Sequence, residues 1–137
     1  MRLDEMRVAH LGIIEDHIDL LKRVRAGEQP VPTPLDWAKS ILSKAGAPIT
    51  DGDIKKYLEA AGAVYCYEGW LWKEALSGKY DFDLEKHRGD FIDSTQLHYL
   101  ADPQTHFLTA DKQIAPRIKQ SPKSSQIISY NEFVKSL

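Results

Sequence analysis

The stretch DSTQLHYLADPQTHFLTADKQIAPRIKQSPKSSQIIS, residues 93–129, decides the expected fold. It contains two short apolar runs, 106–109 and 126–129, each bounded by turn-forming residues, and such runs predict buried strands. The segment between them, 111–119, has the pattern of a helix. A strand, a helix and a second strand in this order form a parallel crossover, which predicts a parallel sheet of the α/β class.

Helices are expected on both sides of this crossover. Residues 93–101 form a short helix before the first strand. Ser129 and Glu132 make a capping box for a last helix that carries Phe133, Val134 and Leu137. Residues 79–89 lack a clean period and are expected to form a loop.

The N-terminal part, residues 1–78, is expected to be helical. Apolar residues recur at steps of three and four over 3–25, and Gly27 follows the last of them. A second helix is predicted from Thr33, a good N-cap followed by Pro34. Thr50 resembles the start of a capping box for a third, long helix that reaches about Leu76, with Gly62 and Gly69 inside it.

The predicted sheet is incomplete, because sheets of this kind usually have about five strands. A parallel pair of strands leaves two edges unpaired and is not stable by itself. We therefore predict an α/β fold with flanking helices and a helix-rich N-terminal half. Two alternatives account for the missing strands: the chain is the C-terminal part of a larger domain, or a partner completes the sheet, either a second copy or another protein.

Composition narrows the class of protein. The chain has 137 residues, of which 42% are hydrophobic and 28% charged, as in one ordinary globular domain. No apolar run approaches the roughly 20 residues of a membrane span, and the N-terminus lacks the pattern of a secretory signal. The single cysteine, Cys66, favours a packing role in a reduced, cytoplasmic compartment.

The formal net charge of −2 argues against a polycation that coats nucleic acid. Cations nevertheless gather in the C-terminal segment, against a single anion, Glu132, for a local balance of +4: Lys112, Arg117, Lys119, Lys123 and Lys135. This segment is interpreted either as the solvated face of helices or as a basic surface that attracts phosphates.

Three acidic residues could support chemistry at one edge of the predicted sheet. Asp90 and Asp93 lie at the start of one predicted helix, and Asp111 follows the first strand. Ligands of parallel α/β sheets bind at the carboxyl ends of strands, and converging carboxylates suit Mg²⁺ or Mn²⁺. Asp is also a preferred N-cap, so Asp93 and Asp111 could instead serve as caps of their helices.

The residues from 88 to 137 resemble the C-terminal half of PIN domains, a family of metal-dependent ribonucleases. The resemblance lies in Asp93 opening a helix, the small residue Ala101, and the strand that ends in Thr109-Ala-Asp111. It implies a PIN-like parallel sheet and a pocket of acids that holds Mg²⁺ or Mn²⁺, where an activated water cleaves RNA.

The same resemblance implies roles for individual residues. Asp93 and Asp111 would be metal ligands, and Asp90 a further ligand or a group that supports them. Thr109 would be a polar support in the substrate-binding region, and Lys112 would contact a phosphate. The family also implies a toxin–antitoxin setting with a protein partner.

The chain departs from the family pattern at its beginning. PIN domains start with a strand that ends in Asp, and no such strand precedes Asp90. Glu5 is a candidate for the family's second acid and also reads as a solvated charge. With part of the ligand set missing, the resemblance implies an incomplete metal site and an inactive chain by itself.

The main alternative is a non-catalytic helical module for protein interaction or dimerisation. In that case the carboxylates are caps, and Trp37, Trp70 and Trp72 form a binding surface.

Overall fold

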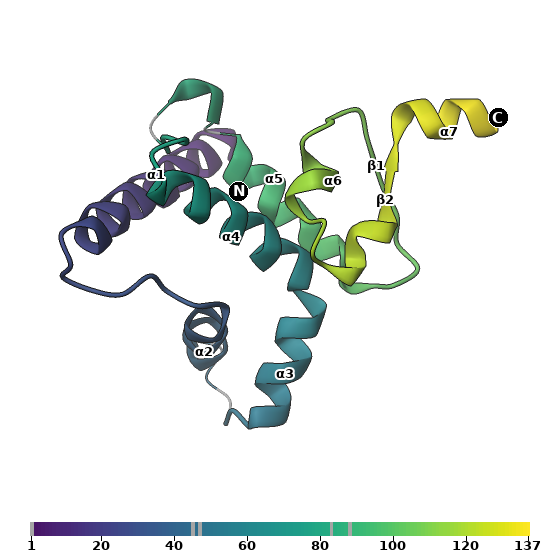
Figure 1. The fold of residues 1–137 in the computed structure, drawn as a ribbon. Coiled ribbons are helices and arrows are strands. Elements are labelled where there is room, and N and C mark those ends of the chain that lie inside the picture. Colours follow the sequence, from purple (N-terminus) through teal and green to yellow (C-terminus); the bar gives the residue numbers. More distant parts are fainter. Residues whose placement is uncertain (1, 45, 47, 83, 88) are drawn as a thin grey trace. The chain divides into compact units, whose positions relative to one another are not determined.

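The computed structural model describes residues 2–44, 46, 48–82, 84–87 and 89–137, and of residues 6, 7, 9, 10 and 13 it describes the backbone alone. The α-helices are α1 (Leu3–Arg25), α2 (Pro34–Lys44), α3 (Asp51–Ala60), α4 (Gly62–Leu76), α5 (Asp90–Gln96), α6 (Ile114–Arg117) and α7 (Tyr130–Ser136) (Figure 1). Three short 3₁₀ helices are η1 (Glu85–His87), η2 (Leu97–Ala101) and η3 (Pro122–Gln126). The strands are β1 (Phe107–Thr109) and β2 (Ile127–Ser129).

The described residues thus form a helix-rich fold with a small parallel sheet. Strands β1 and β2 pair in parallel, with Phe107 opposite Ile127 and Thr109 opposite Ser129. Both strands and the parallel crossover between them were predicted from the sequence and are confirmed. Their common direction places Thr109 and Ser129 side by side at the carboxyl end of the sheet.

Side-chain caps set the beginnings of the N-terminal helices, as expected. The backbone N–H of Asp36 donates to Thr33 Oγ1 at 3.2 Å, and the carboxylate of Asp36 accepts from the backbone of Thr33 at 2.9 Å. Thr50 and Asp53 form the same reciprocal pair before α3. Hydrogen bonds from the backbone and hydroxyl of each threonine lower the pKa of Asp36 and of Asp53.

The structure divides the helix predicted from Thr50 to Leu76 into α3 and α4, at the first of the two glycines that made a kink possible. The break is at Ala61, whose ψ of 13° leaves the helical region while its side chain is buried. Gly62 follows directly, and a methyl group there would contact the Ser121 hydroxyl. The low helix propensity of glycine favours an interruption of the helix at this point.

Two predicted helices around the sheet have different bounds. The helix expected at 93–101 begins at Asp90 and changes to 3₁₀ geometry at Leu97. The helix expected at 111–119 is reduced to α6, because the side chains of Thr109 and Asp111 accept hydrogen bonds from the backbone two residues later. Such local bonds hold residues 109–113 in turns and delay the start of the helix.

The chain divides into two compact units, and helices α4 and α5 contribute to both. Unit 1 consists of residues 1–31 and 71–93. Its interior combines aliphatic and aromatic side chains, and the ring of His17 lies 4.1 Å from that of Phe91 and 5.9 Å from that of Phe82. Tyr80 and Phe82 are buried here, as expected for the loop that carries them.

Unit 2 consists of residues 32–70 and 94–137. Its buried apolar side chains come from α2, α3, α4, η2 and α6 and from residues next to them: Ala38, Ile54, Ala61, Ala63, Val64, Tyr67, Leu97, Leu100, Ile114 and Ile118. Within this unit α2 packs against α3, and α7 contacts both strands. None of the described helices combines the length and the apolar character that a membrane span requires.

Candidate functional site

A pocket of about 270 Å³ lies at the carboxyl end of the parallel sheet in unit 2. The residues that line it end or follow the two strands: Thr109 ends β1 and precedes Ala110, Asp111 and Lys112, and Ser129 ends β2 and precedes Tyr130 and Asn131. Parallel pairing is the reason that both sets of residues meet at one edge. The structure therefore brings together Thr109, Asp111 and Lys112, three of the five residues predicted from the sequence.

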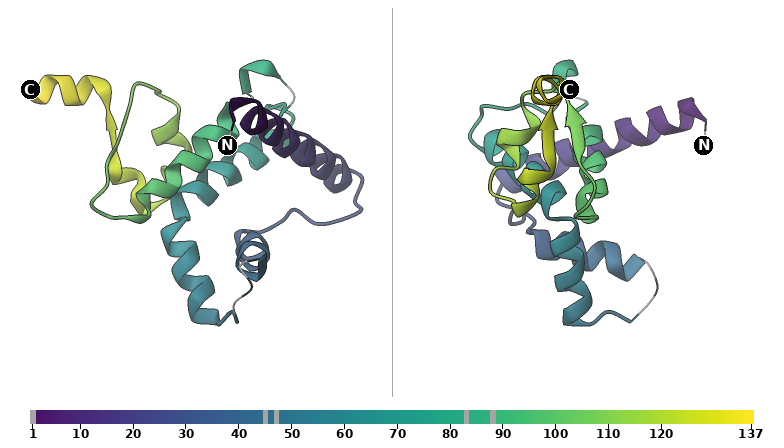
Figure 2. Two further views of the ribbon diagram at one scale, coloured as in Figure 1. Left: turned by 180° about the vertical axis from the view of Figure 1, so that it is seen from behind. Right: turned by 90° about the vertical axis from the view of Figure 1, so that its right-hand side faces the viewer.

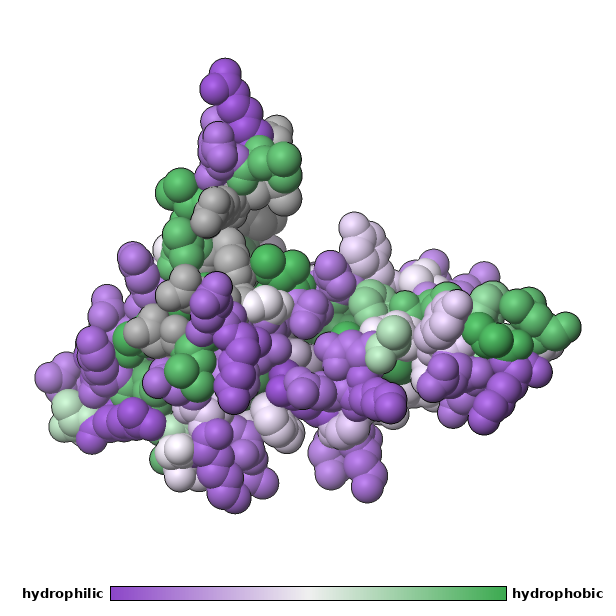
Figure 3. Space-filling model, turned by 90° about the horizontal axis from the view of Figure 1, so that it is seen from above, coloured by the Kyte–Doolittle hydropathy of each residue, from purple (hydrophilic) through white to green (hydrophobic). Residues whose placement is uncertain are grey.

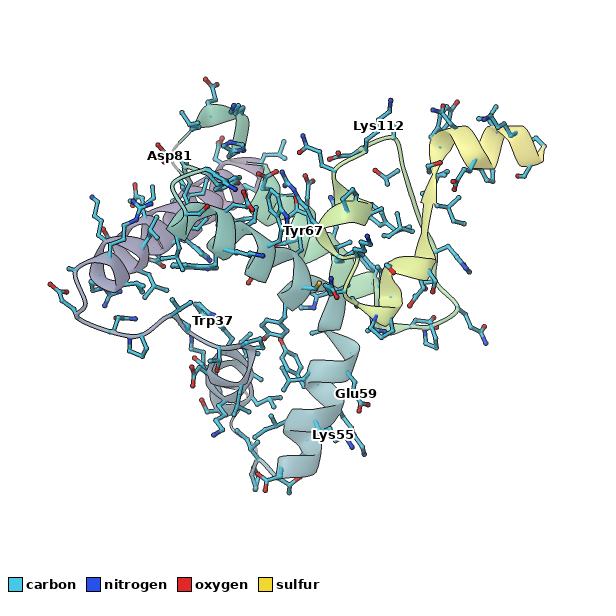
Figure 4. All side chains as sticks on the ribbon, viewed as in Figure 1. Trp37, Lys55, Glu59, Tyr67, Asp81 and Lys112 are labelled. Atoms are coloured by element: carbon cyan, nitrogen blue, oxygen red, sulfur yellow. The ribbon has the colours of Figure 1, made fainter. Side chains whose placement is uncertain are left out.

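Hydrogen bonds hold the β1 side of this pocket in a defined turn. The backbone N–H of Asp111 donates to Thr109 Oγ1 at 3.0 Å, and the backbone N–H of Gln113 donates to Asp111 Oδ1 at 2.8 Å. Asp111 is therefore not the N-cap of α6, which begins at Ile114. Asp111 and Lys112 are both exposed, and Figure 4 labels Lys112 on the segment between β1 and α6.

The β2 side adds three residues that the sequence analysis did not assign to a site. Ser129 caps α7, because its hydroxyl accepts from the backbone of Glu132 at 3.1 Å. Tyr130 and Asn131 form the first turn of that helix and complete the lining. The sequence could have indicated them, because Tyr130 and Asn131 follow the second predicted strand as Asp111 follows the first predicted strand.

Asp90 is placed in a cluster of its own within unit 1. It is a buried residue whose carboxylate accepts a hydrogen bond from the Tyr80 hydroxyl. The same carboxylate oxygen lies 3.3 Å from Nδ1 of His87, and the His87 ring lies 4.1 Å from the ring of Tyr80. Asp90 is thus the centre of a polar cluster that the sequence pattern did not reveal.

Asp93 lies in the first turn of α5, where its backbone N–H donates to the carbonyl of Gly89. It is therefore inside the helix, and the expectation that it opens the helix as an N-cap is wrong. Asp90 and Asp93 are three residues apart on one helix and so share a face. Asp93 belongs to unit 1 and Asp111 to unit 2.

No cluster of three or more His, Cys, Asp or Glu side chains that could hold a metal ion occurs among the described residues. Among the residues that line the strand-end pocket, Asp111 supplies a carboxylate. Glu5 is exposed near the start of α1, where its carboxylate accepts from the backbone of Arg2.

The cations of the C-terminal segment differ in how far they are exposed to solvent. Arg117 is 8% exposed, and its guanidinium lies 4.3 Å from the ring centroid of Trp70. Lys123 donates to the carbonyl of Leu100 at 2.7 Å. The cations that stay exposed are Lys112, Lys119 and Lys135. Stacking on aromatic faces explains how a guanidinium is accommodated inside the unit.

Trp70 and Trp72 do not form the binding surface that was predicted for a non-catalytic interaction module. Trp72 is buried in unit 1, with its ring 5.4 Å from that of Phe82, and Trp70 covers Arg117 in unit 2. The prediction of a binding surface that includes Trp72 is therefore wrong. Cys66 has the packing role that was expected, with its thiol 3.7 Å from the carbonyl of Arg117.

Glu68 is a half-buried acid that sequence reasoning missed. Burial raises the pKa of its carboxyl, and a hydrogen bond from the Ser94 hydroxyl at 3.3 Å acts in the opposite direction. Burial likewise raises the pKa of Tyr65, whose hydroxyl lies 3.2 Å from that of Tyr57. On η2, burial lowers the pKa of His98.

No protein-family model, no curated protein and no solved structure matches this chain.

Proposed function

We propose that this chain carries part of the active site of a PIN-like, metal-dependent ribonuclease that hydrolyses RNA phosphodiester bonds with Mg²⁺ or Mn²⁺. One observation supports the proposal above the others. Asp111 and Lys112, a carboxylate and a cation, line one pocket with the hydroxyl-bearing residues Thr109 and Ser129 at the carboxyl end of parallel strands. This is the edge at which α/β folds bind their ligands.

The donor set of the pocket suits a hard cation. Its side chains offer oxygen from a carboxylate, hydroxyls and an amide, and Mg²⁺ is commonly bound by one or two carboxylates together with substrate phosphate and water. Asp111 is the proposed ligand within the pocket. On α5, Asp93 is proposed as a metal ligand and Asp90 as the residue that supports it from the same face.

The residues of the chain divide the work of phosphodiester hydrolysis. Thr109 holds the turn that presents Asp111, and Lys112 binds a phosphate oxygen of the RNA backbone through its ammonium group. A bound Mg²⁺ or Mn²⁺ supplies an activated water and stabilises the charge that develops on the phosphate. The family pattern also has an Asp at the end of its first strand and an acid on the following helix. We infer that a segment or partner outside this chain supplies these acids.

The test of metal binding is the melting temperature with and without Mn²⁺. A ligand that binds the folded chain alone stabilises it by about 2.7 kcal/mol at a concentration of 100 times the dissociation constant. We expect Mn²⁺ to raise the melting temperature of the wild type and not that of Asp111→Asn. A response that is equal in the two proteins would reject Asp111 as a ligand.

Asp102→Asn is the matched control for this substitution. Asp102 is also exposed, and its Oδ1 accepts from the backbone of Gln104 at 2.9 Å, as Asp111 accepts from Gln113. The two variants therefore remove the same charge from the same kind of turn, and Asp102→Asn should keep the Mn²⁺ response. Cleavage of a labelled single-stranded RNA, measured with the same proteins, tests the reaction itself.

A second candidate function is a non-catalytic interaction or dimerisation module. The observation that favours it is the apolar surface of α7, of which no residue is buried. In that case Mn²⁺ has no effect on the melting temperature, and the melting temperature depends on protein concentration.

A further inference from the structure

Two turns of unit 2 have the same pattern, an Asp followed two residues later by a Gln. In the first turn, the backbone N–H of Gln104 donates to Oδ1 of Asp102 at 2.9 Å. In the second turn, the backbone N–H of Gln113 donates to Oδ1 of Asp111 at 2.8 Å. A bond of this kind orients a carboxylate against its own turn. Of the two aspartates, Asp111 is the one that lines the strand-end pocket.

The side chain of Gln113 is held by a buried cation. Its Oε1 accepts a hydrogen bond from Nη2 of Arg117 at 2.9 Å. The guanidinium is fixed in turn by its bond to the Tyr67 hydroxyl at 2.8 Å and by the ring of Trp70, whose centroid lies 4.3 Å away. Because a guanidinium is planar, fixing it also fixes the direction in which it donates to Gln113. A charged donor makes this bond about twice as strong as one between neutral groups.

Gln104 is not held in this way. Its side chain makes no hydrogen bond to any residue that the structure describes. The loop of the first turn is held instead through its backbone, because the carbonyls of Asp102 and Thr105 accept from the amide of Gln126. The first turn therefore offers a natural comparison for the second, with the same local bond and a different support.

The support matters because the second turn is in contact with water. Residues 111–113 are polar and exposed, in contrast to the apolar surface of α7, which is green at the right-hand end of Figure 3. Water competes for hydrogen bonds at an exposed turn, which lowers their net contribution. The bond from Arg117 connects this exposed turn with a group that is fixed in the interior of unit 2.

The turn lies where β1 and β2 end, and the right-hand view of Figure 2 shows these strands side by side with a common direction. We propose that Gln113 is a positioning residue of the strand-end pocket. The guanidinium of Arg117 holds its side chain, and its backbone N–H holds the carboxylate of Asp111 in one orientation. This orientation is a property of the chain by itself, whereas its use for a metal ion rests on the proposed function.

The consequence for metal binding follows from the oxygen that is held. Oδ1 of Asp111 accepts from Gln113, so Oδ2 is the oxygen that would bind Mg²⁺ or Mn²⁺. Carboxylates that bind metal ions are commonly hydrogen-bonded by neighbouring groups, and loss of such a group typically lowers metal affinity by roughly 10–100-fold. Gln113 would supply this support to the pocket without contacting the metal ion.

NMR of the full chain without metal tests the orientation. Three-bond couplings across χ1 of Asp111 give the populations of its rotamers, and we expect one dominant rotamer in the wild type. Gln113→Met has a side chain of similar length with no acceptor for Arg117, so it should give averaged couplings. Gln104→Met is the matched control and should leave the couplings of Asp102 unchanged, because Gln104 has no support to lose.

Two charged substitutions separate the reach of the side chain from its charge. Gln113→Glu keeps an acceptor at the distance of the guanidinium and should retain the dominant rotamer of Asp111. Gln113→Asp has the same charge on a side chain that is one methylene group shorter. Because this side chain does not reach Arg117, the variant should resemble Gln113→Met.

The dissociation constant for Mn²⁺, measured from the electron paramagnetic resonance of the free ion, tests the consequence. Gln113→Met should weaken Mn²⁺ binding by about tenfold or more, with little change in the melting temperature without metal, because Gln113 is exposed. Gln104→Met should bind Mn²⁺ as the wild type does. A purely structural role of Gln113 would instead lower the melting temperature and leave the affinity of the folded chain unchanged.

Averaged couplings of Asp111 in the wild type would overturn the inference, as would equal couplings in the wild type and Gln113→Met. The same holds if Gln113→Asp retains the rotamer as well as Gln113→Glu does, or if a wild type that binds Mn²⁺ and Gln113→Met have equal affinity. A wild type that does not bind Mn²⁺ rejects the proposed function, and the couplings then decide the role of Gln113 by themselves.

Discussion

The guanidinium of Arg117 donates a hydrogen bond to the hydroxyl of Tyr67 across 2.8 Å, within the interior of unit 2. A second nitrogen donates to Gln113 Oε1 at 2.9 Å, and the charged plane lies over the ring of Trp70. The cation thus connects α4 with the segment that leads from the strand-end pocket into α6. Its hydrogen bonds and aromatic neighbours replace part of the hydration that burial removes.

Arg117→Met should lower the free energy of unfolding by about 2–3 kcal/mol, because it removes two hydrogen bonds of a charged group, one of them to the buried Tyr67 hydroxyl. Arg117→Lys should not restore stability, since an ammonium group cannot reproduce the two separated bonds of the guanidinium fork. Urea unfolding measures both values. Lys119→Met, at an exposed neighbouring cation, is the control and should change stability by less than about 0.5 kcal/mol.

Tyr80→Phe should destabilise the chain by about 1–3 kcal/mol, because it removes a hydroxyl that donates to the buried carboxylate of Asp90. Tyr99→Phe removes a hydroxyl from a side chain that is largely exposed and should have little effect. Chemical unfolding of the two variants under the same conditions compares them directly. Similar losses of stability would mean that the bond to Asp90 contributes nothing of its own.

Gln126→Ala should cost about 1–3 kcal/mol, because the Gln126 amide donates to three backbone carbonyls before β1. Its Nε2 lies 3.3, 2.9 and 2.8 Å from their oxygens, which belong to Leu100, Asp102 and Thr105. Gln104→Ala, at an exposed glutamine of the same loop, is the control. If the bonds hold this loop, amide hydrogen exchange in residues 100–105 should accelerate in Gln126→Ala and stay unchanged in Gln104→Ala.

Glu68 should make the stability of the chain fall as pH rises. Burial raises the pKa of Glu68 in the folded chain above its unfolded value of about 4.5. At a pH between the two values, the folded chain still holds this proton and the unfolded chain has lost it. Stability is therefore complete below that window and decreases as pH rises through it. Unfolding measured from pH 4 upward should show this slope.

Glu68→Gln tests the assignment, because an amide does not titrate. The variant should show a weaker decrease over this pH range and be more stable than the wild type at its upper end. Ser94→Ala removes a hydrogen bond that lowers the pKa of Glu68, so it should extend the decrease to higher pH. Glu28→Gln, at an exposed glutamate, is expected to keep the slope of the wild type.

Local sequence patterns were enough to predict most of the helices and both strands. The apolar period of α1, the reciprocal bonds of Thr33 and Thr50, and the short runs of β1 and β2 all act within a few residues. The predicted bounds of some helices were wrong, where local turns or single residues ended the helical geometry. The helical pattern is interrupted at Ala61, before the glycine Gly62, and turns at Thr109 and Asp111 shorten α6.

The candidate site was predictable on one side only. Thr109, Asp111 and Lys112 were found because they follow the first strand and match a family pattern, whereas Ser129 and Asn131 were read only as parts of a helix start. Nothing in the sequence around Arg117 distinguishes it from the exposed Lys119. Its burial depends on Tyr67 and Trp70, about fifty positions earlier in the chain.

The amino-acid sequence alone determined that the chain is rich in helices, where most of them begin, and that its last third contains two parallel strands. These features follow from hydrogen bonds and apolar spacings between residues that are close along the chain. The tertiary structure alone decided which polar groups are buried and which of them bond to each other, as Asp90 does with Tyr80 and Glu68 with Ser94. It also decided that no residue of α7 is buried. Those outcomes depend on contacts between distant segments, whose partners no local pattern specifies.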